Sequence, residues 1–535
     1  MLRSRRPPSL LAVASLVRST SAFFVAPPVQ LASTAAASSV STRLIATTAA
    51  TSSSTGQMAD TGEILEPQGK HYPWYSLGPL TEAGQWSASP GTYFKKLTEE
   101  NGGAPIYKAH PGLACIALTD YASGEWFFNQ PETVLDRQDG AYFGPLKCTK
   151  EYVGTSLPAL VTNMKEAHAA VRKYTLSLLM ERLGSVQSAW SHSSDNFYKN
   201  LWANGTGIDY NTLYDVFLQQ SSSFMLEWLL ATGEEGGQPL PPFKDFLNVN
   251  PSDINLLLKL EIDTPVANAV GNIAQALAGG ITSEQKASVN VLLDSIRSSR
   301  MWPKFVEMMK EQKVDISELE RSFMFNTGFQ SSAAISKNME FAVGALSVHR
   351  DFLEDLRQEL DGKELNMKNI DSVTEFPLLD SFHWEILRFC PAPPFFFKAA
   401  KMDLLVPTNS GAKYQIRRGD MLCCHQPLMQ TDSAKFGPDA KEINPRRFLE
   451  NPEMKKAVKA YAFSDSSNPV YKEGNPWGCA AHAAGMLDST IKLFYARWVQ
   501  EAEWELEAPA VIDAVDYLGS VGPEGISFSK ITPRK

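Results

Sequence analysis

The stretch Gly474-Asn475-Pro476-Trp477-Gly478-Cys479 decides the fold, because it places a cysteine at the end of a loop rich in glycine and proline. Apolar residues then recur at helical spacing at Leu487, Ile491, Phe494 and Trp498. A cysteine near a helix N-terminus meets unpaired backbone amides and the positive end of the helix dipole, which favour the thiolate. The stretch therefore predicts a loop that delivers Cys479 to a final helix. An inert buried cysteine is the alternative that this stretch alone leaves open.

A second motif, Glu385-Ile386-Leu387-Arg388, stands about ninety residues earlier. It falls in a predicted helix whose apolar positions Leu379, Phe382, Ile386 and Phe389 mark one face. Glu385 and Arg388 are three positions apart, so their side chains can pair. On its own, such a pair is a common surface ion pair.

A third motif, Pro445-Arg446-Arg447-Phe448, lies between the first two and supplies another arginine. A carboxylate shared by two guanidiniums would lock the helix to the loop that follows it. The order of the three motifs carries the prediction. We expect a structural lock of Glu385, Arg388 and Arg447 upstream of Cys479.

Composition places the chain among globular proteins. Its 535 residues are 44% apolar and 10% aromatic, which is enough for a sizeable core. The formal net charge is −9 and no long basic run is present, which argues against nucleic acid as a partner. Six cysteines without C-x-x-C spacing indicate reduced thiols. Cys423-Cys424-His425 has no second cluster, so a buried strand is expected there and not a metal site.

The sequence before residue 63 is predicted to be a leader outside the fold. In residues 1–22, Arg3, Arg5 and Arg6 precede a short apolar run and small residues, which is typical of a secretory signal. Residues 23–62 open with Phe23, are rich in Ala, Ser and Thr, and contain no acidic residue before Asp60, which is typical of a transit peptide. Together they predict a bipartite plastid leader. The alternatives are the secretory pathway or endoplasmic reticulum, and a merely disordered leader.

Residues 63–535 are predicted to form a single large domain that is mainly α with small β-sheets. We expect β-like pieces such as 114–118 among turns from about 69 to 131, helices from about 163 to 360, and short strands from 398 to 422. Turn-rich sequence from 430 to 476 leads into the final helix. No apolar run after the leader reaches membrane-spanning length. The mature protein is therefore expected to be soluble or to contact a membrane only peripherally.

The ordered series of motifs resembles the C-terminal third of the cytochrome P-450 superfamily. This resemblance implies the cytochrome P-450 fold, one haem-binding domain, and haem b (iron protoporphyrin IX) with Cys479 as the axial ligand of the iron. Within the superfamily the chain is similar to the branch that metabolises fatty-acid hydroperoxides, namely allene oxide synthases, hydroperoxide lyases, divinyl ether synthases and epoxyalcohol synthases. That likeness rests on Trp384-Glu385-Ile386-Leu387-Arg388, Pro391 to Pro394, Lys398-Ala399, Arg418 to Leu422, and Gln426-Pro427.

Two neighbours of Cys479 depart from the superfamily pattern. Trp477 stands where an arginine usually contacts a haem propionate, and Ala481 replaces a usual glycine. The propionate contact must then come from elsewhere, and the candidates are His168, Arg172 and His482. The same departures keep open a catalytically silent haem-binding or lipid-binding protein that has retained the fold.

The helix expected above the haem lacks the oxygen-activating motif of the monooxygenases. Their A-G-x-[DE]-T stretch aligns with Ala333-Ala334-Ile335-Ser336-Lys337, so the acid–alcohol pair is missing. Gln330 falls where the hydroperoxide branch shows an asparagine after a phenylalanine, and its amide is the candidate catalytic group that holds a peroxide oxygen. An amide bonded to a neighbouring backbone carbonyl is the alternative. The resemblance places Phe143, Phe329 and Ala333 in the substrate pocket.

The resemblance implies an enzyme that rearranges or cleaves polyunsaturated fatty-acid hydroperoxides, as a lyase, a dehydrase or an isomerase. The peroxide carries its own oxygen and electrons, so neither O2 nor NADPH nor a redox partner is expected to be needed. The alternative is a monooxygenase of a lipid, carotenoid or sterol that depends on O2 and a reductase.

Overall fold

A computed structural model describes residues 63–136, 180–203, 302–312, 332–459, 486–506 and 528–534, apart from residues 89, 112–113, 132, 181 and 392–394. Eight single helical positions between residues 221 and 298 are described as well. The elements below belong to these residues.

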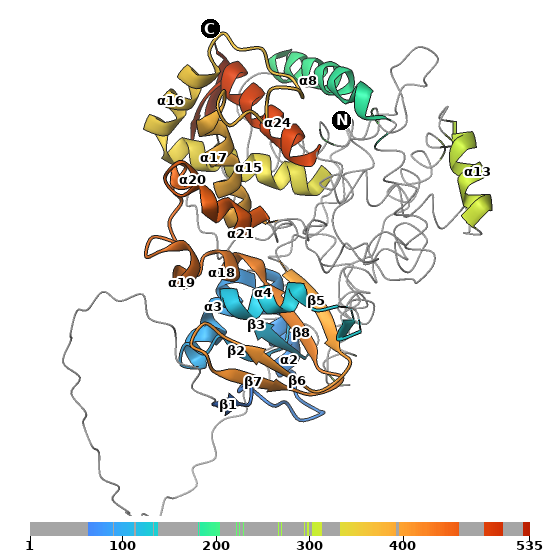
Figure 1. Ribbon diagram of the computed structural model, residues 1–535, viewed down its shortest axis with the longest axis vertical. Helices are drawn as coiled ribbons and strands as arrows, with labels where there is room; N and C mark the ends of the chain where they lie inside the picture. Colours follow the sequence, from blue (N-terminus) through green and yellow to red (C-terminus); the bar gives the residue numbers. More distant parts are fainter. Residues whose placement is uncertain are drawn as a thin grey trace, which may run out of the picture. The chain divides into compact units, whose positions relative to one another are not determined.

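Helices make up most of the described residues (Figure 1). The helices and helical turns are α2 (Gly78–Ala88), α3 (Pro90–Glu100), α4 (Tyr121–Asn129), η1 (Leu183–Ser185), α8 (Val186–Ala203), α13 (Trp302–Gln312), α15 (Ser332–Val348), α16 (Arg350–Leu360), α17 (Pro377–Phe389), α18 (Gln426–Gln430), α19 (Ser433–Phe436), α20 (Arg447–Glu450), η4 (Pro452–Met454), α21 (Lys455–Lys459) and α24 (Leu487–Glu501). Within the described ranges, no helix combines the length and the apolar character needed to span a membrane.

The strands form three small sheets among the described residues. They are β1 (Ile64–Leu65), β2 (Ile106–Ala109), β3 (Cys115–Leu118), β4 (Leu135–Asp136), β5 (Phe395–Ala400), β6 (Leu404–Pro407), β7 (Lys413–Ile416), β8 (Met421–His425), β9 (Ala502–Leu506) and β10 (Phe528–Pro533). The five-stranded sheet has the order β2-β3-β8-β5-β4, with β3 and β8 parallel and the other neighbours antiparallel. The others are β1-β7-β6 and the antiparallel pair β10-β9.

Helices α15, α16, α17 and α24 pack side by side and form the helical core (Figure 1). In α17 every side chain from 379 to 389 is buried, because this helix is surrounded by other elements and not laid on a surface. Phe341 of α15 stacks on Phe389, and the Asn338 side-chain amide donates to the carbonyl of Cys390 at 2.9 Å. Pro391 follows that cysteine, and a residue before proline disfavours helical backbone, so α17 ends there.

Strand β8 lies inside the five-stranded sheet and carries Cys423, Cys424 and His425. All three side chains are fully buried. Cys424 is opposite Phe396 of β5, which is the middle residue of the Phe395-Phe396-Phe397 run. The expectation of a buried strand at this motif is confirmed.

The N-terminal part of the domain is more helical than the sequence suggested. Helices α2, α3 and α4 occupy much of the range in which β pieces and turns were expected. Gly78, Pro79 and Gly84 lower the helix propensity of α2. The packing face of this helix is nevertheless buried, because its Trp86 belongs to one core cluster with Tyr93 and Phe94 of α3. Tertiary packing therefore overrides local preference here.

Candidate functional site

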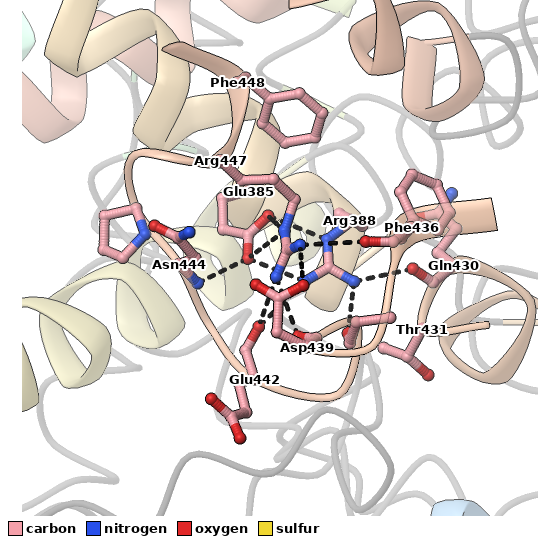
Figure 2. A network of polar contacts seen from close by, with 12 residues as sticks. Glu385, Arg388, Gln430, Thr431, Phe436, Asp439, Glu442, Asn444, Arg447 and Phe448 are labelled. Atoms are coloured by element: carbon pink, nitrogen blue, oxygen red, sulfur yellow. Dashed lines mark hydrogen bonds and ion pairs between the residues drawn. The ribbon is translucent and has the colours of Figure 1, made fainter. Parts of the chain in front are cut away.

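Glu385 and Arg388 of α17 form a buried ion pair in two hydrogen bonds. The Arg388 Nε donates to Glu385 Oε2 at 2.9 Å, and its Nη2 donates to Oε1 at 2.8 Å (Figure 2). Both side chains are fully buried. Bidentate pairing of this kind fixes the orientation of both groups.

Arg447, at the start of α20, reaches the same carboxylate. Its Nε lies 3.3 Å from Glu385 Oε1 and 3.2 Å from Oε2, and its Nη1 donates to Asp439 Oδ1 at 2.9 Å. The backbone N–H of Asn444 also donates to Glu385 Oε1, at 2.8 Å. The structure thus brings together Glu385, Arg388 and Arg447, which are far apart in the sequence.

The remaining guanidinium N–H groups bind backbone carbonyls of the loop between α18 and α20. Arg388 donates to the carbonyls of Gln430 at 2.9 Å, Ala440 at 2.6 Å and Glu442 at 3.1 Å. Arg447 donates to the carbonyls of Phe436 at 3.1 Å, Asp439 at 3.0 Å and Glu442 at 3.1 Å. Figure 2 shows both guanidiniums enclosed by this loop. The two arginines therefore fix α17 to residues 430–447.

The charges in this cluster balance, with two guanidiniums against two carboxylates. Burial lowers the pKa of Arg388, and the Glu385 carboxylate opposes that shift. Burial also acts to lower the pKa of Arg447, but Asp439 and Glu385 outweigh it and raise that pKa. The hydrogen bond from Arg447 lowers the pKa of Asp439. Paired in this way, the buried charges are stable together, and removal of one would leave another uncompensated.

Most of the other predicted site residues lie outside the described part of the chain. Ala333 belongs to α15, although its side chain is not among those described. The residues outside the described ranges are Phe143, His168, Arg172, Phe329, Gln330, Cys479 and His482. Their assigned roles therefore stay predictions.

The described cysteines are poor candidates for a thiolate ligand. Cys115, Cys390, Cys423 and Cys424 are buried, and none of them forms a disulfide within the described part of the chain. Burial raises the pKa of Cys423 and of Cys424, which keeps both thiols protonated. Among the described residues, no group of three or more His, Cys, Asp or Glu side chains could hold a metal ion.

The two described helices that flank Cys479 in the sequence pack on the same helix. Helix α21 precedes the cysteine in sequence, helix α24 follows it, and both pack on α17. Most of the side chains of α24 are buried. A mainly α domain with small sheets and a buried Glu-Arg-Arg lock ahead of a cysteine is the combination that the resemblance to the cytochrome P-450 superfamily implies.

The comparison with known proteins agrees with this resemblance. A cytochrome P450 family model matches residues 268–465. An epoxyalcohol synthase of Ectocarpus siliculosus is 60% identical over 89% of this chain and all of its own length. A hydroperoxide bicyclase of the same organism is 53% identical over 90% of this chain and 93% of its own. The chain belongs to the cytochrome P450 family, and membership implies a haem-thiolate protein.

One plant relative matches a shorter part of the chain. A chloroplastic linolenate hydroperoxide lyase of Arabidopsis thaliana is 27% identical over 26% of this chain. The expected resemblance to hydroperoxide-metabolising relatives is confirmed by these findings together.

The expectation of a plastid leader is wrong. The hydroperoxide bicyclase of Ectocarpus siliculosus is named as mitochondrial, and so is one of Plasmodiophora brassicae that is 29% identical over 85% of this chain. Leaders rich in arginine and serine and poor in acidic residues serve both mitochondria and chloroplasts. Composition alone therefore did not separate the two destinations.

The sequence reasoning missed a second buried charge cluster on α17. Asp380, Lys455 and Lys492 meet there. Their only sequence signal is a lysine, Lys492, which stands between the apolar residues Ile491 and Leu493 of the final helix. A buried lysine requires an anionic partner, which that position could have suggested.

Proposed function

We propose that this enzyme isomerises hydroperoxides of polyunsaturated fatty acids to epoxyalcohols. The observation that carries the proposal is the 60% identity to an epoxyalcohol synthase over that protein's whole length. An epoxyalcohol has the same atoms as the unsaturated hydroperoxide, since one peroxide oxygen becomes the epoxide and the other the alcohol. The conversion therefore needs neither O2 nor NADPH nor a redox partner.

Cys479 would hold haem b through its thiolate, and the haem would supply the chemistry that cleaves the O–O bond. His168, Arg172 and His482 would contact its propionates, in place of the usual arginine at position 477. The side-chain amide of Gln330 would donate a hydrogen bond to a peroxide oxygen and orient it. Phe143, Phe329 and Ala333 would line the apolar pocket for the acyl chain. We assign the leader to mitochondrial import, which the names of two relatives support.

The test supplies the purified protein with a fatty-acid hydroperoxide labelled with ¹⁸O in both peroxide oxygens, under anaerobic conditions and without NADPH. We expect rapid consumption and a product of unchanged elemental composition that retains both labels. Loss of water would indicate a dehydrase, and two shorter fragments would indicate a lyase, so either contradicts the isomerase. Turnover that requires NADPH, O2 and a reductase would establish the monooxygenase instead.

Two variants test the assigned roles in the same assay. Cys479→Ala should abolish the thiolate-type spectrum of the ferrous carbonyl complex. Gln330→Leu removes one hydrogen bond to the reacting oxygen, which is worth roughly 1.5–3 kcal/mol, so turnover should fall about ten- to a hundredfold. Its haem content should stay at the parent level. A Cys479→Ala protein with an unchanged spectrum would show that Cys479 is not the iron ligand. A Gln330→Leu protein with an unchanged turnover rate would show that Gln330 does not bond the reacting oxygen.

A further inference from the structure

The Asp380 carboxylate of α17 binds two lysines that come from opposite sides of the cysteine segment. Lys492 of α24 donates to Asp380 Oδ1 at 2.7 Å. Lys455, the first residue of α21, is hydrogen-bonded to Oδ2 of the same carboxylate. The indole N–H of Trp384 donates to Oδ1 at 3.3 Å and holds the carboxylate from within α17. One carboxylate therefore joins three helices.

The pairing is buried and fully charged at neutral pH. Asp380 and Lys492 are 4% and 3% exposed, so water screens their attraction little. Burial alone would raise the pKa of Asp380, but Lys492 and Lys455 outweigh it and lower that pKa. Burial would lower the pKa of Lys492, but Asp380 and Asp371 outweigh it and raise it.

The two lysines lie on opposite sides of the cysteine segment in the sequence. Lys455 stands just before residues 460–485, and Lys492 stands just after them. That stretch contains Cys479. Bringing the two ends of a segment to one fixed point removes much of its conformational freedom. The same carboxylate thus anchors both flanks of the segment that supplies the thiolate.

Other acidic groups nearby anchor one flank only. Asp371 accepts from Lys492 at 3.0 Å and is hydrogen-bonded to Ser489, and both partners lie on α24. Asp488 lies 3.1 Å from the Nε2 of His383, again between α24 and α17. Asp371 is therefore a matched control that shares Lys492 with Asp380 but not Lys455.

We propose that Asp380 is a positioning residue for the iron ligand, because it fixes both ends of the segment that carries Cys479. The inference rests on the proposed ligand role of Cys479 and is independent of the substrate. It predicts that the loss of Asp380 loosens both flanks and impairs thiolate ligation, whereas the loss of Asp371 loosens the α24 flank alone.

The test compares Asp380→Asn with Asp371→Asn in the full-length holoprotein. Hydrogen exchange followed by mass spectrometry reads peptides from residues 455–459 and from 486–492. In Asp380→Asn we expect exchange about tenfold faster or more on both flanks, since a hydrogen bond to a charged group is lost on each side. The ferrous carbonyl spectrum should show a smaller thiolate-ligated fraction. In Asp371→Asn only the 486–492 peptide should exchange faster, with the thiolate spectrum retained, because Lys492 keeps its hydrogen bond to Asp380 and both flanks stay joined to that carboxylate.

Two further variants keep the test decisive. Lys455→Met breaks only the upstream contact, and this lysine side chain is 19% exposed, so the variant serves if Asp380→Asn does not fold. Lys455→Met should accelerate exchange at 455–459 and lower the thiolate-ligated fraction. Asp380→Glu keeps the carboxylate, so it should retain much of the thiolate-ligated fraction that Asp380→Asn loses. Parent-like exchange and spectrum in Asp380→Asn or in Lys455→Met, or an equal spectral loss in Asp371→Asn, would overturn the proposal. Hydrogen exchange and the ferrous carbonyl spectrum do not require a substrate, so a failed hydroperoxide assay would not affect this test.

Discussion

Arg446 and Arg447 are neighbours in sequence, but their side chains lie in opposite surroundings. Arg447 is 3% exposed and binds Glu385, Asp439 and three backbone carbonyls. Arg446 pairs with Asp355 with both side chains more than a third exposed, at 39% and 46%. Substitutions at these two adjacent positions therefore compare a buried ion pair with an exposed one.

Replacing Arg447 by alanine should lower the free energy of unfolding by about 3–5 kcal/mol, because it removes one partner of a buried charge cluster and leaves the carbonyls of Phe436, Asp439 and Glu442 without this donor. Arg446→Ala should cost about 1 kcal/mol or less, as exposed ion pairs do. Urea denaturation of both variants measures the difference, and haem content should fall with Arg447→Ala only. Equal stability of the two variants would show that the buried lock adds nothing.

The lock could be predicted from sequence, whereas the cluster around Asp380 could not. Glu385 and Arg388 are three residues apart, and a second arginine follows in a recognisable motif, so their partnership was open to pattern reasoning. Asp380 and Lys455 are unremarkable polar residues in sequence, and the position of Lys492 indicates only that it needs some anionic partner. Their meeting depends on how three helices cross, which local patterns do not contain.

At the level of elements, helices α4 and α18 meet at a glycine. A Cβ added to Gly124 of α4 would lie 2.4 Å from the Met429 sulfur and 2.8 Å from its Cγ. Met429 is fully buried in α18 and has little room to move. Gly84 of α2 offers the contrast, since a Cβ there would have no neighbour within 4 Å.

Gly124→Ala should destabilise the protein by about 1–3 kcal/mol, because overpacking of a filled core outweighs the gain in helix propensity. Gly84→Ala should stabilise it by about 0.4–1 kcal/mol through the loss of freedom in the unfolded chain. Thermal unfolding of both variants provides the measurement. Adding Met429→Ala to Gly124→Ala should cost less than the sum of the single changes. A stabilised Gly124→Ala protein would show that these two helices can separate freely.

Strong hydrophobic periodicity predicted helix α24, whereas weak helix propensity hid helices α2 and α3. The stripe from Leu487 to Trp498 matches α24, in which all four marked positions are buried. The region from 78 to 100 contains glycines and prolines at α2 and α3, so its local signal favoured turns. Packing against the five-stranded sheet supplies what the local sequence lacks there.

At the scale of the whole molecule, the described structure begins with contacts that tie the first residues to distant strands. The carbonyl of Glu63 accepts from the Lys413 backbone N–H at 3.0 Å, and Leu65 is opposite Tyr414 in the parallel pair of β1 with β7. The carbonyl of Gln68 accepts from the Lys108 N–H at 2.7 Å. Residues 63–77 are thus part of the catalytic domain that we propose to span 63–535.

Two truncations test this boundary. A protein that begins at Glu63 should match the full chain in urea midpoint and haem content, because the deleted leader is proposed to lie outside the domain. A protein that begins at Gly78 loses β1, the Gln68 contact and the hydrogen bond between Tyr72 and Glu82. Each lost hydrogen bond is worth about 1 kcal/mol, so several kcal/mol of stability should disappear and haem content should drop. If the chain that begins at Glu63 failed to bind haem, the leader would have to be counted as part of the folded enzyme. If the chain that begins at Gly78 were as stable as its parent, residues 63–77 would contribute nothing to the stability of the domain.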